Sequence, residues 1–267
     1  MPAGLPMYDF PDVRMATDSW WNGLARHLSR AGIPDVPTSL LRRDDLIEQW
    51  QDPALLISQT CGYLLTHELR ADLRPVATPH YTAPGCVGPA YASVILARQD
   101  HPGATVADFE GGVAVYSRSY SHAGYNAFRG MVAPLARGKP FFSRVIGSGS
   151  HLDSIATLAT GAGDLATVDC VIHAFVSRWR PGALAGTRVL GFTDPAPAAP
   201  YVAPISASND RVARLRQALD AAVHDPDLAA ARDDLFIAGF SHLEFLDYST
   251  IASVETEAIA RGYPNLV

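Results

Sequence analysis

The stretch FSRVIGSGSHLDSIATLATGAGDLATVD, residues 142–169, contains a complete strand, helix and strand. The strand-like segment at residues 141–150 ends in a Gly/Ser turn, a helical pattern covers residues 151–161, and a second strand-like run covers residues 164–169. Short strands that alternate with helices of this length are typical of βαβ units, in which neighbouring strands run parallel and helices cover the sheet. The stretch therefore predicts an α/β fold with mainly parallel sheets.

The same alternation recurs along the chain. Strand-like runs at residues 54–60 and 111–117 precede helical patterns at residues 61–73 and 124–136, and the run 187–193 closes the series. This repetition extends the α/β prediction to both halves of the chain.

The first helix is predicted within residues 11–32. Gly32 ends it, because a glycine after the last apolar position is a common stop signal. One apolar stripe recurs at helical spacing: Val13, Ala16, Trp20, Leu24 and Leu28.

Two segments are predicted to connect two lobes. Residues 93–112 pass from an apolar strand through a Pro/Gly turn, and residues 191–204 form a Pro-rich extended segment that disfavours helix. Lobe 1 is then residues 1–96 and 194–267, and lobe 2 is residues 97–193, with a ligand cleft expected between the two sheets. The helical C-terminal region is expected to pack on lobe 1.

The composition is that of a folded globular protein and argues against several partners. The chain has 267 residues, of which 48% are hydrophobic and 18% are charged, and its formal net charge is −6. Nucleic acid and anionic membrane surfaces are poor candidates, because both attract a basic patch that this chain lacks. No apolar stretch reaches the roughly 18 residues that a membrane span needs.

Two features bear on the cellular compartment and leave it open. The N-terminus lacks the basic and apolar regions of a secretory leader, so a cytoplasmic location is expected if the sequence is the full precursor and a periplasmic one if a leader has been removed. Of the cysteines Cys61, Cys86 and Cys170, at least one is unpaired within the chain. Buried thiols in a reducing compartment are the default interpretation, and export would allow a Cys61–Cys86 bridge between two Gly-containing turns.

Polar residues follow the predicted strands where open α/β sheets bind ligands, at strand carboxyl ends and helix N-termini. The candidate ligand-binding residues are Tyr8, Gln59, Thr60, Ser119, Ser121, His122, Ala123, Gly124, Tyr125, His151 and Asp169. Ser121 supplies a hydroxyl, Gly124 permits close approach, and the N–H groups of residues 122–124 are expected to form an anion nest. Each residue also has an ordinary structural explanation as a cap, a turn or a core-edge residue. Their repeated location at strand ends favours a binding site.

Signatures of other chemistry are incomplete. GAGDLA at residues 161–166 fits a dinucleotide fingerprint but precedes a strand instead of following one, GKP at 138–140 lacks the rest of a P-loop, and no GxSxG occurs. Four potential zinc ligands lack the close pair that anchors such sites: Cys61, His67, His80 and Cys86. No catalytic residue, metal or cofactor is therefore expected.

Several segments resemble the phosphonate-binding proteins of ABC importers. Residues 142–169 are similar to a family segment in which a Gly-Ser-His turn opens a helix and an xGxxDxAxxD motif follows. YSRSYSHAGYNAFRG, residues 116–130, resembles the Ser/Thr-rich helix start with which that family holds the phosphonate oxygens. SQTCGY at residues 58–63 resembles the first-lobe binding segment, and residues 183–202 resemble the return crossing. The resemblance runs in order from about Leu5 to Gly239.

The resemblance implies a type 2 periplasmic-binding-protein fold, whose two hinged lobes close on a small oxyanion or phosphonate-like solute, with an ABC permease as partner. His122 and Ala123 depart from the family pattern and remove one hydroxyl. Two other functions are compatible with the same fold. One is an enzyme resembling the chorismate dehydratase of menaquinone synthesis, with His151 and Asp169 as acid and base. The other is a cytoplasmic ligand sensor that docks on a partner.

Overall fold

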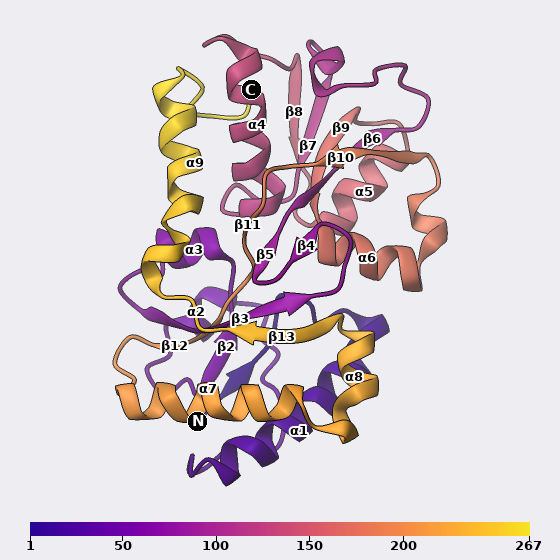
Figure 1. The fold of residues 1–267 in the computed structure, drawn as a ribbon. Coiled ribbons are helices and arrows are strands. Elements are labelled where there is room, and N and C mark those ends of the chain that lie inside the picture. Colours follow the sequence, from indigo (N-terminus) through magenta and orange to yellow (C-terminus); the bar gives the residue numbers. More distant parts are fainter. The chain divides into compact units, whose positions relative to one another are not determined.

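Strands and helices alternate through the computed structural model, which describes residues 1–267 (Figure 1). The chain forms two units: unit 1 contains Met1–Thr82, Val87–Ala90 and Pro197–Ser249, and unit 2 contains Ala83–Cys86, Tyr91–Ala196 and Thr250–Val267. Three short strands lie where the chain passes between units, in the order β11-β5-β4. They are β4 (Cys86–Val87), β5 (Ala90–Tyr91) and β11 (Ala196–Pro197).

Unit 1 is built on a sheet with the strand order β1-β2-β12-β3-β13. Its strands are β1 (Ala3–Gly4), β2 (Ile57–Gln59), β3 (Leu73–Tyr81), β12 (Tyr201–Pro204) and β13 (Ile237–Ser241). Its helices are η1 (Pro11–Val13), α1 (Arg14–Arg30), α2 (Leu46–Trp50), α3 (Gly62–Thr66), α7 (Asn209–Val223), η5 (Pro226–Leu228), α8 (Ala229–Asp234) and η6 (Phe245–Tyr248). Helix α7 packs on β3 and β13, and α1 packs on α7 and α8 (Figure 1).

Unit 2 is built on a second sheet with the order β10-β6-β9-β7-β8. Its strands are β6 (Ser93–Arg98), β7 (Val113–Tyr116), β8 (Arg144–Gly147), β9 (Leu165–Asp169) and β10 (Thr187–Phe192). Its helices are η2 (Val106–Phe109), the π-helical turn η3 (His122–Asn126), α4 (Ala127–Ala136), α5 (His151–Ala159), α6 (Cys170–Trp179), η4 (Pro181–Leu184) and α9 (Ser249–Ala260).

The α/β class is confirmed, while the strand directions are more mixed than predicted. In unit 2, β9, β7 and β8 run parallel, as predicted, but β6 lies antiparallel between β10 and β9. In unit 1, β1 and β2 are parallel, whereas β12 pairs antiparallel with both of its neighbours and β13 pairs antiparallel with β3. Strands β6 and β12 each begin shortly after the chain has passed from one unit to the other. They therefore do not follow a helix of a βαβ unit, whose connection would make them parallel to their neighbours.

Local signals explain where the helices begin and end. All five residues of the predicted apolar stripe of α1 are buried, and Gly32 has a φ of +81°, which favours glycine after the helix end. Ser150 caps α5, because its side chain accepts a hydrogen bond from the Asp153 N–H at 3.1 Å. The Ser150 cap lies in the turn after the carboxyl end of β8.

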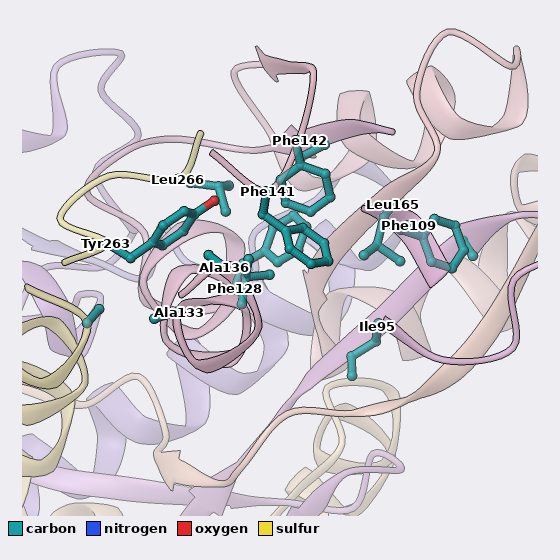
Figure 2. Packing of buried hydrophobic residues seen from close by; sticks show 14 residues of the cluster. Ile95, Phe109, Phe128, Ala133, Ala136, Phe141, Phe142, Leu165, Tyr263 and Leu266 are labelled. Atoms are coloured by element: carbon teal, nitrogen blue, oxygen red, sulfur yellow. The ribbon is translucent and has the colours of Figure 1, made fainter. Parts of the chain in front are cut away.

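The core of unit 2 lies between its sheet and helix α4. Figure 2 shows Phe128, Ala133 and Ala136 of α4 near the aromatic pair Phe141 and Phe142. The C-terminal side chains of Tyr263 and Leu266 belong to the same buried cluster. The end of the chain is thus part of the core of unit 2.

The position of α9 corrects one expectation. The C-terminal helical region was expected to pack on lobe 1, and α7 and α8 do belong to unit 1, but residues Thr250–Val267 belong to unit 2. Helix α9 runs beside α4, where a Cβ added to Gly130 would lie 2.4 Å from Val254 (Figure 1). The unit boundaries at residues 82–91 and 196–197 lie close to the predicted crossings at 96–97 and 193–194.

Candidate functional site

The carboxyl ends of the parallel strands of unit 2 lie side by side. Strands β9, β7 and β8 are neighbours, and the loop after β8 is hydrogen-bonded to the loop after β7. The Ser148 N–H donates to the Tyr116 carbonyl at 2.8 Å, and the Gly149 N–H donates to the Ser117 carbonyl at 2.8 Å. Residues that follow three different strands are thereby gathered at one edge of the sheet, where α/β proteins bind ligands.

Ser121 begins the π-helical turn η3. Its hydroxyl accepts a hydrogen bond from the Gly124 N–H at 3.0 Å, and its carbonyl accepts from the Tyr125 and Asn126 N–H groups at 3.2 and 3.0 Å. The predicted cap is therefore present at Ser121, while the side chain of Ser119 is exposed. The N–H groups at the start of a helix have no acceptor within its first turn, so the Ala123 N–H is a donor with which this turn can meet an anion.

Ser117, Gly124 and His151 converge beside this turn. A Cβ on Gly124 would lie 2.0 Å from the Ser117 Oγ and 3.1 Å from the His151 Cε1, so only glycine fits here. The Ser117 hydroxyl is buried and has no hydrogen-bond partner in the protein. A buried hydroxyl without a partner is costly, which makes Ser117 the best-defined candidate for a ligand contact in unit 2. The sequence predicted Ser119 and Ser121 as candidate contacts but not Ser117. Ser117 is the first residue after β7, which is where such contacts are expected.

His151 and Asp169 are adjacent, but not as an imidazole–carboxylate pair. The Asp169 backbone N–H donates to the His151 Nδ1 at 3.4 Å, which leaves the Nε2–H of a neutral imidazole as donor. Burial lowers the His151 pKa to about 4, so the ring is neutral at pH 7. The Asp169 carboxylate instead caps α6, accepting from the Val171 and Ile172 N–H groups at 2.8 and 3.3 Å.

Tyr125 packs toward the C-terminal segment. Its hydroxyl accepts a hydrogen bond from the Leu266 N–H at 3.2 Å, and its ring makes an edge contact with Tyr116 at a centroid distance of 5.0 Å. These contacts give Tyr125 a structural role in unit 2.

Unit 1 brings together Tyr8, Gln59 and a residue not predicted, Tyr81. The Gln59 Nε2 donates to the Tyr81 hydroxyl and to the Ala199 carbonyl, both at 2.9 Å, and the Tyr8 ring meets Tyr81 edge-on. The side chains of Tyr8, Gln59 and Tyr81 all line a small cavity of about 20 Å³. Thr60 follows in the chain, and its buried hydroxyl, like that of Ser117, has no partner in the protein.

His122 is held in one protonation state by its neighbours. The Arg129 Nη2 donates to the Asn126 Oδ1 at 2.7 Å, which orients the Asn126 amide so that its Nδ2 donates to the His122 Nδ1 at 3.2 Å. The His122 Nδ1 is therefore an acceptor and carries no proton. Burial lowers the His122 pKa to about 4.

We expect the folded state to lose stability as the pH falls from 6.5 to 4. In that range the unfolded chain binds a proton at residue 122 and the folded chain does not, since the pKa falls from 6.5 to about 4 on folding. The loss from this one residue is up to about 3 kcal/mol. Urea unfolding at several pH values measures this loss. In the His122→Gln variant, the free energy of unfolding should fall less steeply as the pH is lowered. An unchanged slope in the variant would assign the pH dependence to other groups.

A separate cavity of about 600 Å³ lies within unit 2. Its lining comes from α4, α9 and the segment Phe192–Ala196, and His122 is the only predicted site residue that it includes. No group of three or more His, Cys, Asp and Glu residues is arranged to hold a metal ion, and none of the helices combines the length and apolarity of a membrane span.

The cysteines correct the bridge considered from the sequence. The Cys86 Sγ lies 3.4 Å from the Sγ of Cys170, whereas Cys61 is buried at the start of α3. None of the three cysteines is in a disulfide. The predicted alternative of a Cys61–Cys86 bridge is therefore wrong in its choice of partner, because β4 places Cys86 beside the first residue of α6.

Comparisons with known proteins bear on the family and the fold of the chain. A model of the family described as "ABC transporter, phosphonate, periplasmic substrate-binding protein" matches residues 55–248. A binding protein component of an ABC phosphonate transporter from Pseudomonas aeruginosa has 15% identity and a TM-score of 0.75, over 98% of this chain and 87% of that chain. PhnD1 from Prochlorococcus marinus, in complex with methylphosphonate, has 14% identity and a TM-score of 0.73, over 96% of this chain and 97% of that chain.

A further structure, that of XAC2383 from Xanthomonas citri bound to chloride ion, has 15% identity and a TM-score of 0.72, over 98% of both chains. A search of curated protein sequences found no match. At these identities the structures establish the fold alone, and they confirm the predicted two-lobed periplasmic-binding-protein class.

Proposed function

Because the chain belongs to the family of periplasmic substrate-binding proteins of phosphonate ABC transporters, we propose that it binds a phosphonate or a related small oxyanion. The chain would act in the periplasm and deliver this solute to an ABC permease. The observation that carries the proposal is the buried, unpartnered hydroxyl of Ser117 beside Gly124 and His151.

The chemistry of these groups suits an oxyanion. The Ser117 hydroxyl, the Nε2–H of neutral His151 and the Ala123 N–H are all donors, and hydrogen bonds from such donors to an ionised oxygen are stronger than neutral ones. The absence of a fixed cation among them is no obstacle, since a helix start carries partial positive charge. Ser119, Ser121 and Asp169 remain candidate contacts around these donors.

In unit 1, we propose that Tyr8, Gln59 and Thr60 are solute contacts. The support is the second buried hydroxyl without a partner, that of Thr60, which follows strand β2 as Ser117 follows β7. A buried hydroxyl without a partner at the end of a strand is a group that a bound solute would satisfy.

The proposed role is binding and not catalysis. An acid–base pair would require the His151 imidazole to contact the Asp169 carboxylate, whereas the hydrogen bond runs to the Asp169 backbone and the carboxylate caps α6. This geometry argues against the dehydratase-like alternative.

Thermal unfolding with candidate solutes tests the proposal. A solute that binds only the folded chain raises Tm, by about 5 °C or more at 100 times its Kd. We expect methylphosphonate or inorganic phosphate to do so. Ser117→Ala should weaken the affinity about tenfold, the usual cost of one hydrogen bond to a charged group.

The control is Ser143→Ala, which makes the same chemical change at the other end of the strands, where the Ser143 hydroxyl donates to the Gly112 carbonyl. Its affinity should match that of the natural chain. A Tm unchanged by phosphonates, phosphate, sulfonates and small carboxylates would contradict the proposal.

A further inference from the structure

Cys86 and Cys170 form a close pair of thiols outside the groups assigned to the solute. Their Sγ atoms are 3.4 Å apart, although the residues are 84 positions apart in the chain. Cys86 belongs to β4 and is half-buried, and Cys170 is the buried first residue of α6. Both lie in unit 2, so the pair is part of one compact body.

The turn before Cys86 is held against α6 by packing. Gly85 has a φ of +97°, and a Cβ placed on it would lie 2.7 Å from Phe192 and 3.2 Å from the Cβ of Cys170. The Cys86 N–H donates to the Ala83 carbonyl at 3.0 Å, and the Cys170 N–H donates to the Ala92 carbonyl at 3.3 Å. The two thiols are thus positioned by backbone and packing on both sides.

We propose that Cys86 and Cys170 are a disulfide-forming pair that crosslinks β4 to the start of α6 when the chain meets a small-molecule disulfide. The contact with Cys86, together with burial, raises the pKa of Cys170, so this thiol keeps its proton. Sulfur atoms already in contact need to approach by only about 1.4 Å to reach the length of a disulfide bond.

The exchange runs in two balanced steps. The Cys86 thiolate is the accessible one, and it attacks one sulfur of an external disulfide such as oxidised glutathione, which forms a mixed disulfide and releases one glutathione thiolate. Cys170 then loses its proton and attacks the Cys86 Sγ, which expels the second glutathione thiolate. The protein loses two electrons and two protons, and the external disulfide is reduced to two thiols.

The crosslink would join two functionally distinct parts of the chain. Cys86 is the last residue before the chain enters unit 1, and Cys170 follows Asp169, whose N–H contacts His151. Oxidation would therefore fasten the connecting segment to the helix that borders the candidate site.

The test treats the reduced 267-residue chain with oxidised glutathione, counts thiols in denaturant and maps the bridged peptide by mass spectrometry without reduction. We expect the thiol count to fall from three to one, a peptide pair containing Cys86 and Cys170, and a rise in Tm of about 5 °C from closing a long loop. The mapping uses the natural chain, so it does not depend on the folding of any variant.

Three variants separate the steps. Cys61→Ser should still form the bridge, Cys86→Ser should retain both remaining thiols in the folded chain, and Cys170→Ser should stop at a glutathione adduct on Cys86. Three outcomes would each overturn the proposal. They are a bridge that contains Cys61, a natural chain that stops at the glutathione adduct, and a natural chain that keeps all three thiols after treatment.

Discussion

The Gly124→Ala variant is expected to bind methylphosphonate at least about 100-fold more weakly than the natural chain. The added methyl group would lie 2.0 Å from the Ser117 Oγ and 3.1 Å from the His151 Cε1, so both donors must move. Each hydrogen bond to a charged oxygen contributes about 1.5–3 kcal/mol, and a tenfold change in affinity is about 1.4 kcal/mol, so losing two gives this factor. Isothermal titration calorimetry measures it directly.

A second glycine provides the matched control. In Gly130→Ala the added methyl group would lie 2.4 Å from the Val254 side chain, so the steric change is similar but falls between α4 and α9. This variant should be less stable and should keep the affinity of the natural chain. If Gly124→Ala bound normally, or if both variants lost affinity equally, Gly124 would have no special place in the site.

Hydrophobic spacing predicted most of the fold. The alternation of strands and helices and the buried stripe of α1 follow from periodicities that are local to the sequence. Strand direction in β6 and β12 does not, because direction depends on how a distant segment enters the sheet. The placement of α9 has the same cause, since Ile251 and Glu255 are held by contacts with Asn126 and Arg129, far away in sequence.

The candidate site was predicted as a set of segments better than as a set of side chains. The turn at residues 117–124 and the location of His151 after β8 follow from the rule for strand ends. Which serine lacks a partner depends on burial, and the sequence around Ser117, Ser119 and Ser121 offers no signal that distinguishes them. The sequence likewise did not predict that Cys170 is the neighbour of Cys86, because the two come together only through the packing of β4 on α6.

Arg129 connects the helix behind the candidate site to the end of the chain. It is buried, and its Nη1 donates to the Glu255 Oε1 at 3.0 Å and to the Pro264 carbonyl at 2.8 Å. Its Nη2 donates to the Asn126 Oδ1 at 2.7 Å, the bond that orients the neighbour of His122. One side chain therefore satisfies acceptors on η3, on α9 and in the C-terminal segment, all within unit 2.

Arg129→Met is accordingly expected to lower the free energy of unfolding by about 3–5 kcal/mol, because removing one partner of a buried pair leaves its acceptors unpaired. Urea unfolding followed by circular dichroism measures the change. Glu255→Gln is the matched variant: the glutamine retains an acceptor for the buried guanidinium but removes its carboxylate partner, so its loss should be smaller, about 1–3 kcal/mol. The difference in the free energy of unfolding between the two variants gives the contribution of the Pro264 carbonyl and the Asn126 amide oxygen, without that of the ion pair. If both lost equal stability, the charge of Glu255 and not the neutral acceptors would hold the C-terminal segment in place.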